Sequence, residues 1–227
     1  MRADEPTRGA RPAARDSVVP ALLAALLLLF LLVPLLALVA SGGGAGLRGL
    51  ATDAELRRSL LLTAGTATAA TLVAIALGTP AAFLLARRRF RGRALVQAAL
   101  DLPLLVPHPV AGIALLLVLA RDTPLGGALL AAGLRVVGTP LGIVVAMTFV
   151  SAPLYVSAAR ETFTRVDARY EGVARTLGDS AWRAVRRVTL PLAARGLVAA
   201  ATVTWARAVS EFGAIVVLAY NPRSRAC

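Results

Sequence analysis

The stretch DARYEGVARTLGDSAWRAVRRVTLP, residues 167–191, is the longest polar interval in a chain that is otherwise mostly apolar. Apolar residues recur along its first half at helical steps, and Asp167 is suited to cap that helix at its start. Gly178 follows at the position where a glycine commonly ends a helix. Asp179 or Ser180 is suited to cap a second helix, which we expect to stop at the final Leu-Pro. The stretch therefore predicts two short helices joined by a glycine turn.

The composition indicates a membrane protein. Hydrophobic residues make up 58% of the chain and the mean hydropathy is +0.74, values that soluble domains rarely reach. The formal net charge is +13, but the arginines are grouped in short segments between apolar runs. This grouping favours contact with lipid headgroups over contact with nucleic acid.

The same composition excludes several kinds of chemistry. All 25 basic residues are arginine, so the chain has neither the lysine of a nucleotide-binding P-loop nor a lysine nucleophile. One cysteine and one histidine cannot form a disulfide or a conventional structural zinc site. A membrane enzyme would need clustered acids, histidine or serine at the membrane surface, whereas the 12 acids are mostly scattered singly in loops. We predict no catalytic residues and no metal ligands.

Five apolar segments are long enough to cross about 30 Å of hydrocarbon. A polar tail, residues 1–17, precedes them. A signal peptide is the alternative for the first segment, but the apolar run is long and is followed by SGGGAG rather than by a clear cleavage site. We expect external loops at 41–58, with a short helical end, and at 121–139. The expected spans are 18–40, 59–86, 94–120, 140–159 and 196–220, which together form an all-α polytopic domain over residues 18–220.

The distribution of arginines predicts the orientation of these spans. With the N-terminus inside, the inner segments hold 17 arginines and the outer segments hold 7. Because segments rich in arginine remain in the cytoplasm, the N-terminus and the loop 160–195 are expected there. The inner segments are 1–17, 87–93 and 160–195, and the outer segments are 42–58, 121–139 and 221–227.

Polar residues interrupt two of the apolar segments. In DLPLLVPHPVAGIALLLVLA, three prolines surround His108 and should break the helix, which is tolerated where protein or water surrounds the break. The break could line a pathway, or it could shape a kink in which His108 caps freed carbonyls. In TWARAVSEFGAIVVLAY, Arg207 and Glu211 are four residues apart and should pair inside the protein. Packing or gating, and direct contact with a substrate, both remain open for this pair.

The polar stretch resembles the signature of permease subunits of bacterial and archaeal ABC importers, which reads EAA, three residues, Gly, nine residues, Ile, one residue, Leu-Pro. Here nine residues separate Gly178 from Val188, which precedes Thr-Leu-Pro. The position of the signature glutamate is Gly172, with Glu171 one residue earlier. The resemblance implies a cytoplasmic coupling helix that docks into a groove of an ATPase subunit; the alternative is an amphipathic loop on lipid headgroups. The coupling residues that it implies are Tyr170, Glu171, Val173, Ala174, Leu177, Gly178, Trp182, Leu190 and Pro191.

Further segments are similar to permeases of the molybdate, tungstate and sulfate group. They are GTPAAFLLARRRFRGR, LPLLVPHPVAGIALLL and WARAVSEFGAIVVLAYNP, and with the signature they cover about residues 59–222. The histidine-containing segment is most similar to the tungstate/molybdate branch. Because broken helices and ionisable groups inside a membrane mark a pathway, we expect the translocation pathway or gate at Pro107, His108, Pro109, Arg207, Ser210 and Glu211.

This family implies the transmembrane domain of a type I ABC importer in a prokaryotic cell membrane. Two copies of the permease would form the channel, with ATP bound by two copies of a separate ATPase and an extracytoplasmic protein delivering the oxyanion. The chain itself would bind no cofactor. Permeases of this group continue into a sixth span, whereas this chain ends after residues 221–227, so we expect a truncated form with five spans. A permease for sulfate or another small anion and a non-transporting remnant are the alternatives.

Overall fold

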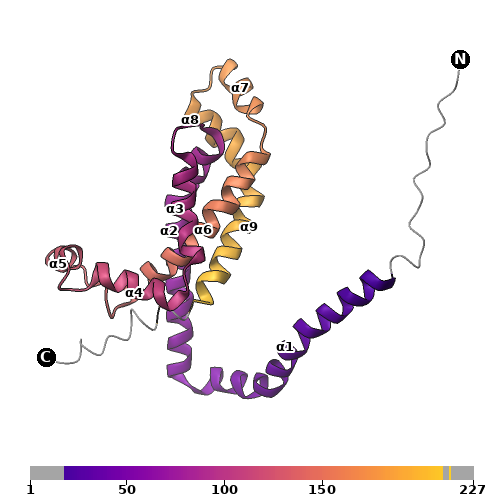
Figure 1. Ribbon diagram of the computed structural model, residues 1–227, viewed down its shortest axis with the longest axis vertical. Helices are drawn as coiled ribbons and strands as arrows, with labels where there is room; N and C mark the ends of the chain where they lie inside the picture. The colour runs from indigo at the N-terminus through magenta and orange to yellow at the C-terminus, as the bar shows by residue number, and fades with distance from the viewer. Residues whose placement is uncertain (1–17, 212–214, 216–227) are drawn as a thin grey trace, which may run out of the picture. The chain divides into compact units, whose positions relative to one another are not determined.

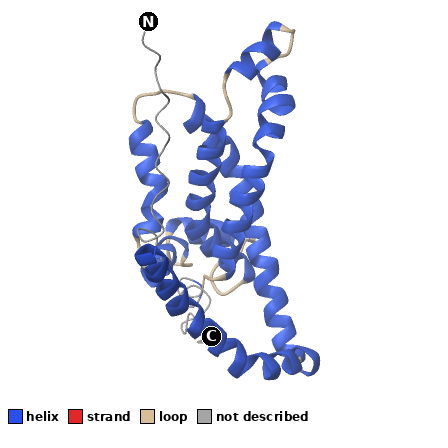
Figure 2. Cartoon of the chain, turned by 90° about the vertical axis from the view of Figure 1, so that its right-hand side faces the viewer, coloured by secondary structure: helices blue, strands red, loops and turns tan. Residues whose placement is uncertain are grey.

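The computed structural model of the chain describes residues 18–211 and residue 215, and all regular elements within them are helical (Figure 2). The chain divides into two units, residues 1–58 and 59–227. The first unit contains helix α1, Val18–Thr52, a leucine-rich helix whose large side chains from Val18 to Val39 are exposed. The second unit contains the packed core and the candidate sites.

The second unit is a bundle of helices with short connections (Figure 1). By length and composition, α1, α2, α6 and the continuous run from α8 to α9 could each cross a membrane. The pair α3 and α4 is bent by 114° and would be a fifth span if it counts as one. The elements are α2 (Ala54–Arg87), α3 (Arg93–Leu105), α4 (His108–Leu119), α5 (Pro124–Ala131), α6 (Pro140–Arg165), α7 (Arg169–Thr176), α8 (Ala181–Ala184), the π-helix η1 (Val185–Thr189) and α9 (Leu190–Val209).

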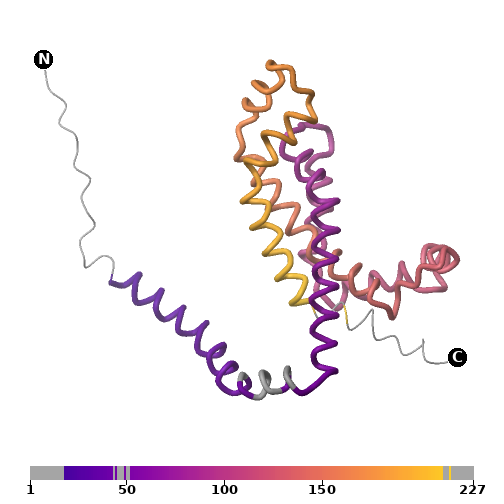
Figure 3. Tube along the Cα trace, turned by 180° about the vertical axis from the view of Figure 1, so that it is seen from behind, coloured from indigo at the N-terminus to yellow at the C-terminus, as the bar shows by residue number. Residues whose placement is uncertain are grey.

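Helix α6 lies at the centre of the core, between α2 and α9. Figures 1 and 3 show α6 and α9 side by side over much of their length. The buried large residues come mainly from α6, among them Tyr155 and Phe163. Alanines from the neighbouring helices cover them, at positions 74, 82, 193 and 200. The hydroxyl of Tyr155 also lies 2.8 Å from that of Thr79, which adds a polar contact between α6 and α2.

Two glycines allow the helices to approach this closely. A Cβ atom added at Gly78 would lie 2.8 Å from Cδ1 of Tyr155, closer than carbon atoms can pack. A Cβ atom at Gly196 would overlap the side chain of Thr162. Small residues at helix contacts are typical of membrane proteins, where van der Waals packing rather than water exclusion drives helix association. The absence of a side chain at these two positions therefore sets the distances from α6 to α2 and to α9.

Two predicted loops contain helices that the sequence reading missed. The structure continues α1 through the glycine-rich stretch to Thr52, so the loop predicted at 41–58 is wrong over most of its length. Glycine permits a turn but does not require one, and in the described residues positive φ angles occur only at glycines 92, 133, 138 and 178. Helix α5 forms within the predicted loop 121–139, where the hydroxyl of Thr123 accepts a hydrogen bond from the Gly126 N–H at 3.0 Å.

The ends of the predicted cytoplasmic loop 160–195 are also helical. Helix α6 continues to Arg165, and α8, η1 and α9 follow one another without interruption from Ala181. The prediction that Leu190-Pro191 stops the second helix is wrong. Pro191 follows the π-helical residues Val185–Thr189, in the first turn of α9. Because the backbone hydrogen bonds there span five residues rather than four, the chain accommodates the proline without ending the helix.

Some predicted segments fall outside the residues that the structure describes. The predicted tail 1–17 and the end 221–227 lie outside the described residues. The fifth predicted span, 196–220, is helical to Val209, where α9 ends with Ser210 as its C-cap. The predicted remainder of that span lies outside the described residues apart from Ser210, Glu211 and Ile215.

Replacing Gly196 with alanine should destabilise the protein because the new methyl group meets the stiff side chain of Thr162. We expect a loss of about 1–3 kcal/mol, measured as a lower melting temperature of the purified protein. Gly65→Ala is the matched control, since no atom lies within 4 Å of its added Cβ. That variant should be unchanged or slightly more stable. Equal melting temperatures for the two variants would contradict the close approach of α6 and α9.

Candidate functional site

The third apolar segment breaks between α3 and α4, at Val106 and Pro107, as the sequence predicts, whereas α3 continues through Pro103. Pro103 lies inside α3, Pro107 is the N-cap of α4, and Pro109 lies in the first turn of α4. The carbonyl of Pro107 accepts backbone hydrogen bonds from Val110 at 2.9 Å and from Ala111 at 3.1 Å. Since the first N–H groups of a helix lack partners within it, Pro109 costs α4 no hydrogen bond. The chain turns sharply at this point and places His108 at the start of α4.

His108 joins a polar cluster with residues from the end of α9. The Nη2 atom of Arg207 lies 3.1 Å from Oε2 of Glu211 and 2.9 Å from Nε2 of His108. The Nη1 atom of Arg207 donates to the hydroxyl of Ser210 at 3.3 Å, and this hydroxyl donates to the Arg207 carbonyl at 2.9 Å. The predicted pair of Arg207 with Glu211 is therefore confirmed. We call Arg207, Glu211, His108 and Ser210 the polar cluster.

The polar cluster is closely connected around the Arg207 guanidinium. Its Nη2 atom also lies 3.2 Å from Nδ1 of His108, and this ring nitrogen lies 3.6 Å from Oε2 of Glu211. Arginine has hydrogen-bond donors only, so its neighbours must offer it acceptor atoms. The guanidinium is engaged by three side chains, which leaves it poorly suited to hold an anion tightly.

The cluster has a buried end and an open end. The side chain of Glu211 is 1% exposed, that of Arg207 is 23% exposed, and that of His108 is 48% exposed. Pro107 and Pro109 beside His108 are exposed as well. The buried carboxylate thus holds Arg207 in place, while His108 lies on the accessible side.

The second candidate site is the polar stretch 167–191. Gly178 has a φ of 97°, a left-handed conformation that favours glycine. Its N–H donates to the Arg175 carbonyl, and the Asp179 N–H donates to the Ala174 carbonyl, each at 3.1 Å. This pair of hydrogen bonds is the Schellman motif, which closes the C-terminal end of α7. The predicted glycine turn between two helices is confirmed.

The N-cap of α7 is Ala168, one residue after the predicted Asp167, although the Asp167 side chain still bonds the start of the helix. A carboxylate oxygen of Asp167 accepts a hydrogen bond from the Arg169 N–H at 2.9 Å. The hydroxyl of Ser180 accepts from the Arg183 N–H at 3.4 Å, so Ser180 rather than Asp179 caps α8. Asp179 pairs instead with arginines of the second helix. The caps and the glycine turn give the segment a defined shape.

Large apolar side chains project outward from this segment. Each is more than half exposed, and they are Tyr170, Val173, Leu177 and Trp182. Ala174 of α7 is buried, Leu190 is partly buried, and Pro191 is exposed. Exposed apolar residues on a short capped segment are suited to contact another protein or a membrane, and Trp182 also lines a cavity with Phe83 and Phe163. We call the four exposed residues Tyr170, Val173, Leu177 and Trp182 the apolar tip.

Glu171 does not belong to this outward surface. Its carboxylate faces the body of the second unit, where Arg87 lies at 3.0 Å and the hydroxyl of Thr189 at 2.8 Å. In the sequence, Arg87 is one of five arginines in the run 87–93, and nothing in the pattern around Thr189 indicates a partner for it. The sequence held only a weak indication that Arg87 differs from the other arginines. It is the first of the run and still belongs to α2, whereas Arg88 and Arg89 follow the end of that helix.

Two further polar contacts between helices could not be predicted from the sequence pattern. The hydroxyl of Ser157 donates to Asp101 at 3.1 Å, and Arg160 donates to the side chain of Gln97 at 3.2 Å. Both contacts join α3 to α6. In the described residues, no group of three or more His, Cys, Asp or Glu side chains could hold a metal ion.

Comparison with known proteins identifies the family. The family described as "binding-protein-dependent transport system inner membrane component" matches residues 78–222. The chain belongs to this family. The matched region contains both the polar cluster and the apolar tip, so the two candidate sites lie within the family's common domain. This membership confirms the resemblance that the signature spacing indicates.

Several curated relatives of this permease family are similar over about three quarters of the chain. The molybdate/tungstate transport system permease protein of Thermococcus kodakarensis is 43% identical over 169 residues, which cover 74% of this chain and 62% of the relative. Its counterpart in Pyrococcus abyssi is 41% identical, with 74% and 61% covered. A probable molybdenum ABC transporter permease of Haloferax volcanii is 43% identical over 185 residues, with 77% and 65% covered. The chain thus spans less than two thirds of the length of these relatives.

Replacing Glu211 with alanine should leave the Arg207 guanidinium without its buried carboxylate. We expect this single variant to be less stable than the double variant Arg207→Ala/Glu211→Ala, because a lone buried charge costs more than none. A coupling free energy on the order of 1–3 kcal/mol is expected from melting temperatures of the single and double variants. Strictly additive losses would mean that the pair does not interact.

Proposed function

We propose that this chain is the permease subunit of an ATP-driven importer for oxyanions of the molybdate and tungstate type. Its partners would be a separate ATPase subunit on the cytoplasmic side, an extracytoplasmic binding protein, and a second copy of the permease. The relatives named for molybdate and tungstate transport support the substrate class. The sequence contains no P-loop lysine, which supports the placement of ATP on another subunit.

The apolar tip is the observation that carries this proposal. The tip is held by two capped helices and a Schellman turn, so it presents a defined surface rather than a mobile loop. A surface of this kind would fit an apolar groove on the ATPase subunit. A movement of either subunit would then be transmitted to the other through this contact. An amphipathic loop lying on lipid headgroups would need no such fixed turn.

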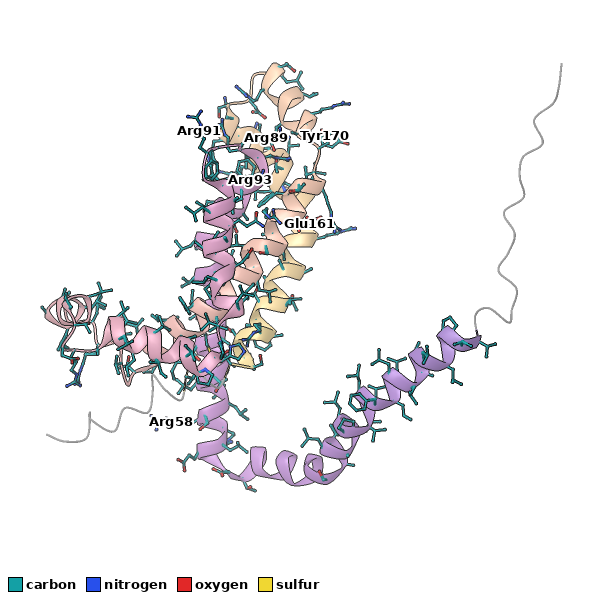
Figure 4. The ribbon with its side chains drawn as sticks, viewed as in Figure 1. Arg58, Arg89, Arg91, Arg93, Glu161 and Tyr170 are labelled. Atoms are coloured by element: carbon teal, nitrogen blue, oxygen red, sulfur yellow. The ribbon has the colours of Figure 1, made fainter. Side chains whose placement is uncertain are left out.

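The positions of the arginines support a cytoplasmic location for the tip. Figure 4 shows Tyr170 of the tip at the same end of the second unit as Arg89, Arg91 and Arg93 around the turn between α2 and α3. Segments rich in arginine remain on the cytoplasmic side of a membrane. The proposed orientation therefore places the arginine-rich turn and the apolar tip in the cytoplasm, and the four arginines of the tail 1–17 favour the same side for the N-terminus.

The polar cluster is the proposed gate of the pathway. It joins the break between α3 and α4 to the end of α9 through hydrogen bonds that would be exchanged when the helices move. Because Arg207 is already engaged, the cluster would offer an anion only weak binding, and weak binding allows the ion to leave again. Discrimination between oxyanions would then lie in the external binding protein.

Replacing Gly178 with valine should distort the turn below the apolar tip, because a β-branched residue is strongly disfavoured at a φ of 97°. We expect reduced retention of the ATPase subunit in a pull-down and a loss of molybdate transport in proteoliposomes. Gly172→Val is the matched control, since Gly172 lies in α7 with open space around its added Cβ. Wild-type retention and transport in the Gly178→Val variant would overturn the assignment of the tip.

The permease with its ATPase should bind molybdate only weakly in the absence of the binding protein. We expect no saturation at micromolar concentrations in an equilibrium binding measurement with radiolabelled molybdate. Exchanging the binding protein for a sulfate-specific one that still docks should change the transported anion. Micromolar binding that is lost in a His108→Ala variant would show that the polar cluster is a true binding site and would contradict the low-affinity channel.

A further inference from the structure

One carboxylate joins segments of the chain that lie far apart in sequence. Oxygen Oε1 of Glu171 accepts hydrogen bonds from Nε of Arg87 at 3.0 Å and from the hydroxyl of Thr189 at 2.8 Å. Nη2 of Arg87 also lies 3.0 Å from the same oxygen. The partners are 84 and 18 residues away from Glu171 along the chain. We call these three residues the Glu171 junction.

The Glu171 junction links four structural elements. Glu171 belongs to α7, Arg87 is the last residue of α2, and Thr189 is the last residue of η1, directly before α9. Arg87 also donates through Nη1 to the carbonyl of Val166, the C-cap of α6, at 2.8 Å. The helix that carries part of the apolar tip is thereby connected to the ends of α2 and α6 and to the start of α9 (Figure 1).

The Glu171 junction is more deeply buried than the other ion pairs of the same region. Thr189 is fully buried, and the side chains of Arg87 and Glu171 are 13% and 19% exposed. The pair of Arg165 with Glu161 is 77% and 56% exposed by comparison. Exposed pairs contribute little, whereas hydrogen bonds to a charged group that is shielded from water are stronger and hold a defined geometry.

The rest of α7 packs only weakly against the bundle. Tyr170 and Val173 point outward, and Ala174 is the only residue of α7 that is buried. Alanine offers a small contact area. The orientation of α7 relative to the long helices therefore depends strongly on the charged hydrogen bonds of Glu171.

We propose that Glu171 is the positioning residue that makes α7 move together with α2, α6 and the start of α9. The inference rests on the proposed docking of the apolar tip to an ATPase subunit and adds how a displacement of the tip reaches the membrane helices. Without the junction, the tip still docks, but α7 turns relative to the bundle. ATP hydrolysis then continues with less transport per ATP.

The test uses the assembled importer with its binding protein in proteoliposomes. Glu171→Gln keeps the shape of the side chain and removes its charge, and Thr189→Val removes the hydroxyl donor. For both variants we expect normal retention of the ATPase subunit and continued ATP hydrolysis. Molybdate transported per ATP should fall by about tenfold in Glu171→Gln, within the usual range of coupling between two sites, and less in Thr189→Val.

Two further variants distinguish the loss of positioning by Glu171 from a general loss of stability. Glu161→Gln removes the carboxylate of an exposed pair and should leave transport per ATP unchanged. Arg87→Glu combined with Glu171→Arg should recover part of the transport per ATP that each single variant loses, because the charged contact is restored in reverse. An unchanged ratio in Glu171→Gln, or no recovery in the reversed pair, would overturn the proposal.

The same measurements distinguish this proposal from the proposed function. Loss of the ATPase subunit in Glu171→Gln, with normal retention in Thr189→Val, would assign Glu171 to docking and overturn its positioning role. Failure of the wild-type chain and the Gly172→Val control to retain any ATPase subunit would instead reject the docking on which the positioning role rests. Each result is read from the pull-down before transport is measured.

Discussion

The close approach of α2 and α9 to α6 is the constraint on which the rest of the second unit depends. Glycine at position 78 and at position 196, together with alanines along the contact, lets the helices pack with few side chains between them. In lipid, such packing replaces the exclusion of water as the main source of association between helices. Because α6 is held on two sides, its ends are fixed, and both candidate sites lie near the ends of this bundle.

Polar groups in the bundle are used where helices end or break. The polar cluster joins the start of α4 to the end of α9, and the Glu171 junction joins the end of α2 to α7 and η1. Unsatisfied polar groups are costly in an apolar environment, so such contacts hold the helix ends in defined positions. In the proposed mechanism, a displacement of the apolar tip would first act on the Glu171 junction, and the opening of the pathway would occur at the polar cluster.

Much of the helical content could be predicted, and the boundaries could not. The glycine turn at Gly178, the break around His108 and the pairing of Arg207 with Glu211 each follow from a local rule. The continuation of α1 through the glycine-rich stretch and the passage of the helix through Pro191 do not. In both cases the residue weakens a helix without forbidding it, and the neighbouring helical backbone determines the outcome.

The sequence by itself determined the apolar helices, the proline break, the capped turn and the spacing that indicates the permease family. These features depend on periodicity, on lost N–H donors and on residues a few positions apart. Only the tertiary structure decided that Glu171 faces inward toward Arg87 and Thr189 and does not join the exposed docking residues Tyr170, Val173, Leu177 and Trp182. The physical reason is that a hydrogen bond across 84 residues depends on how the helices pack, which no local pattern in the chain records.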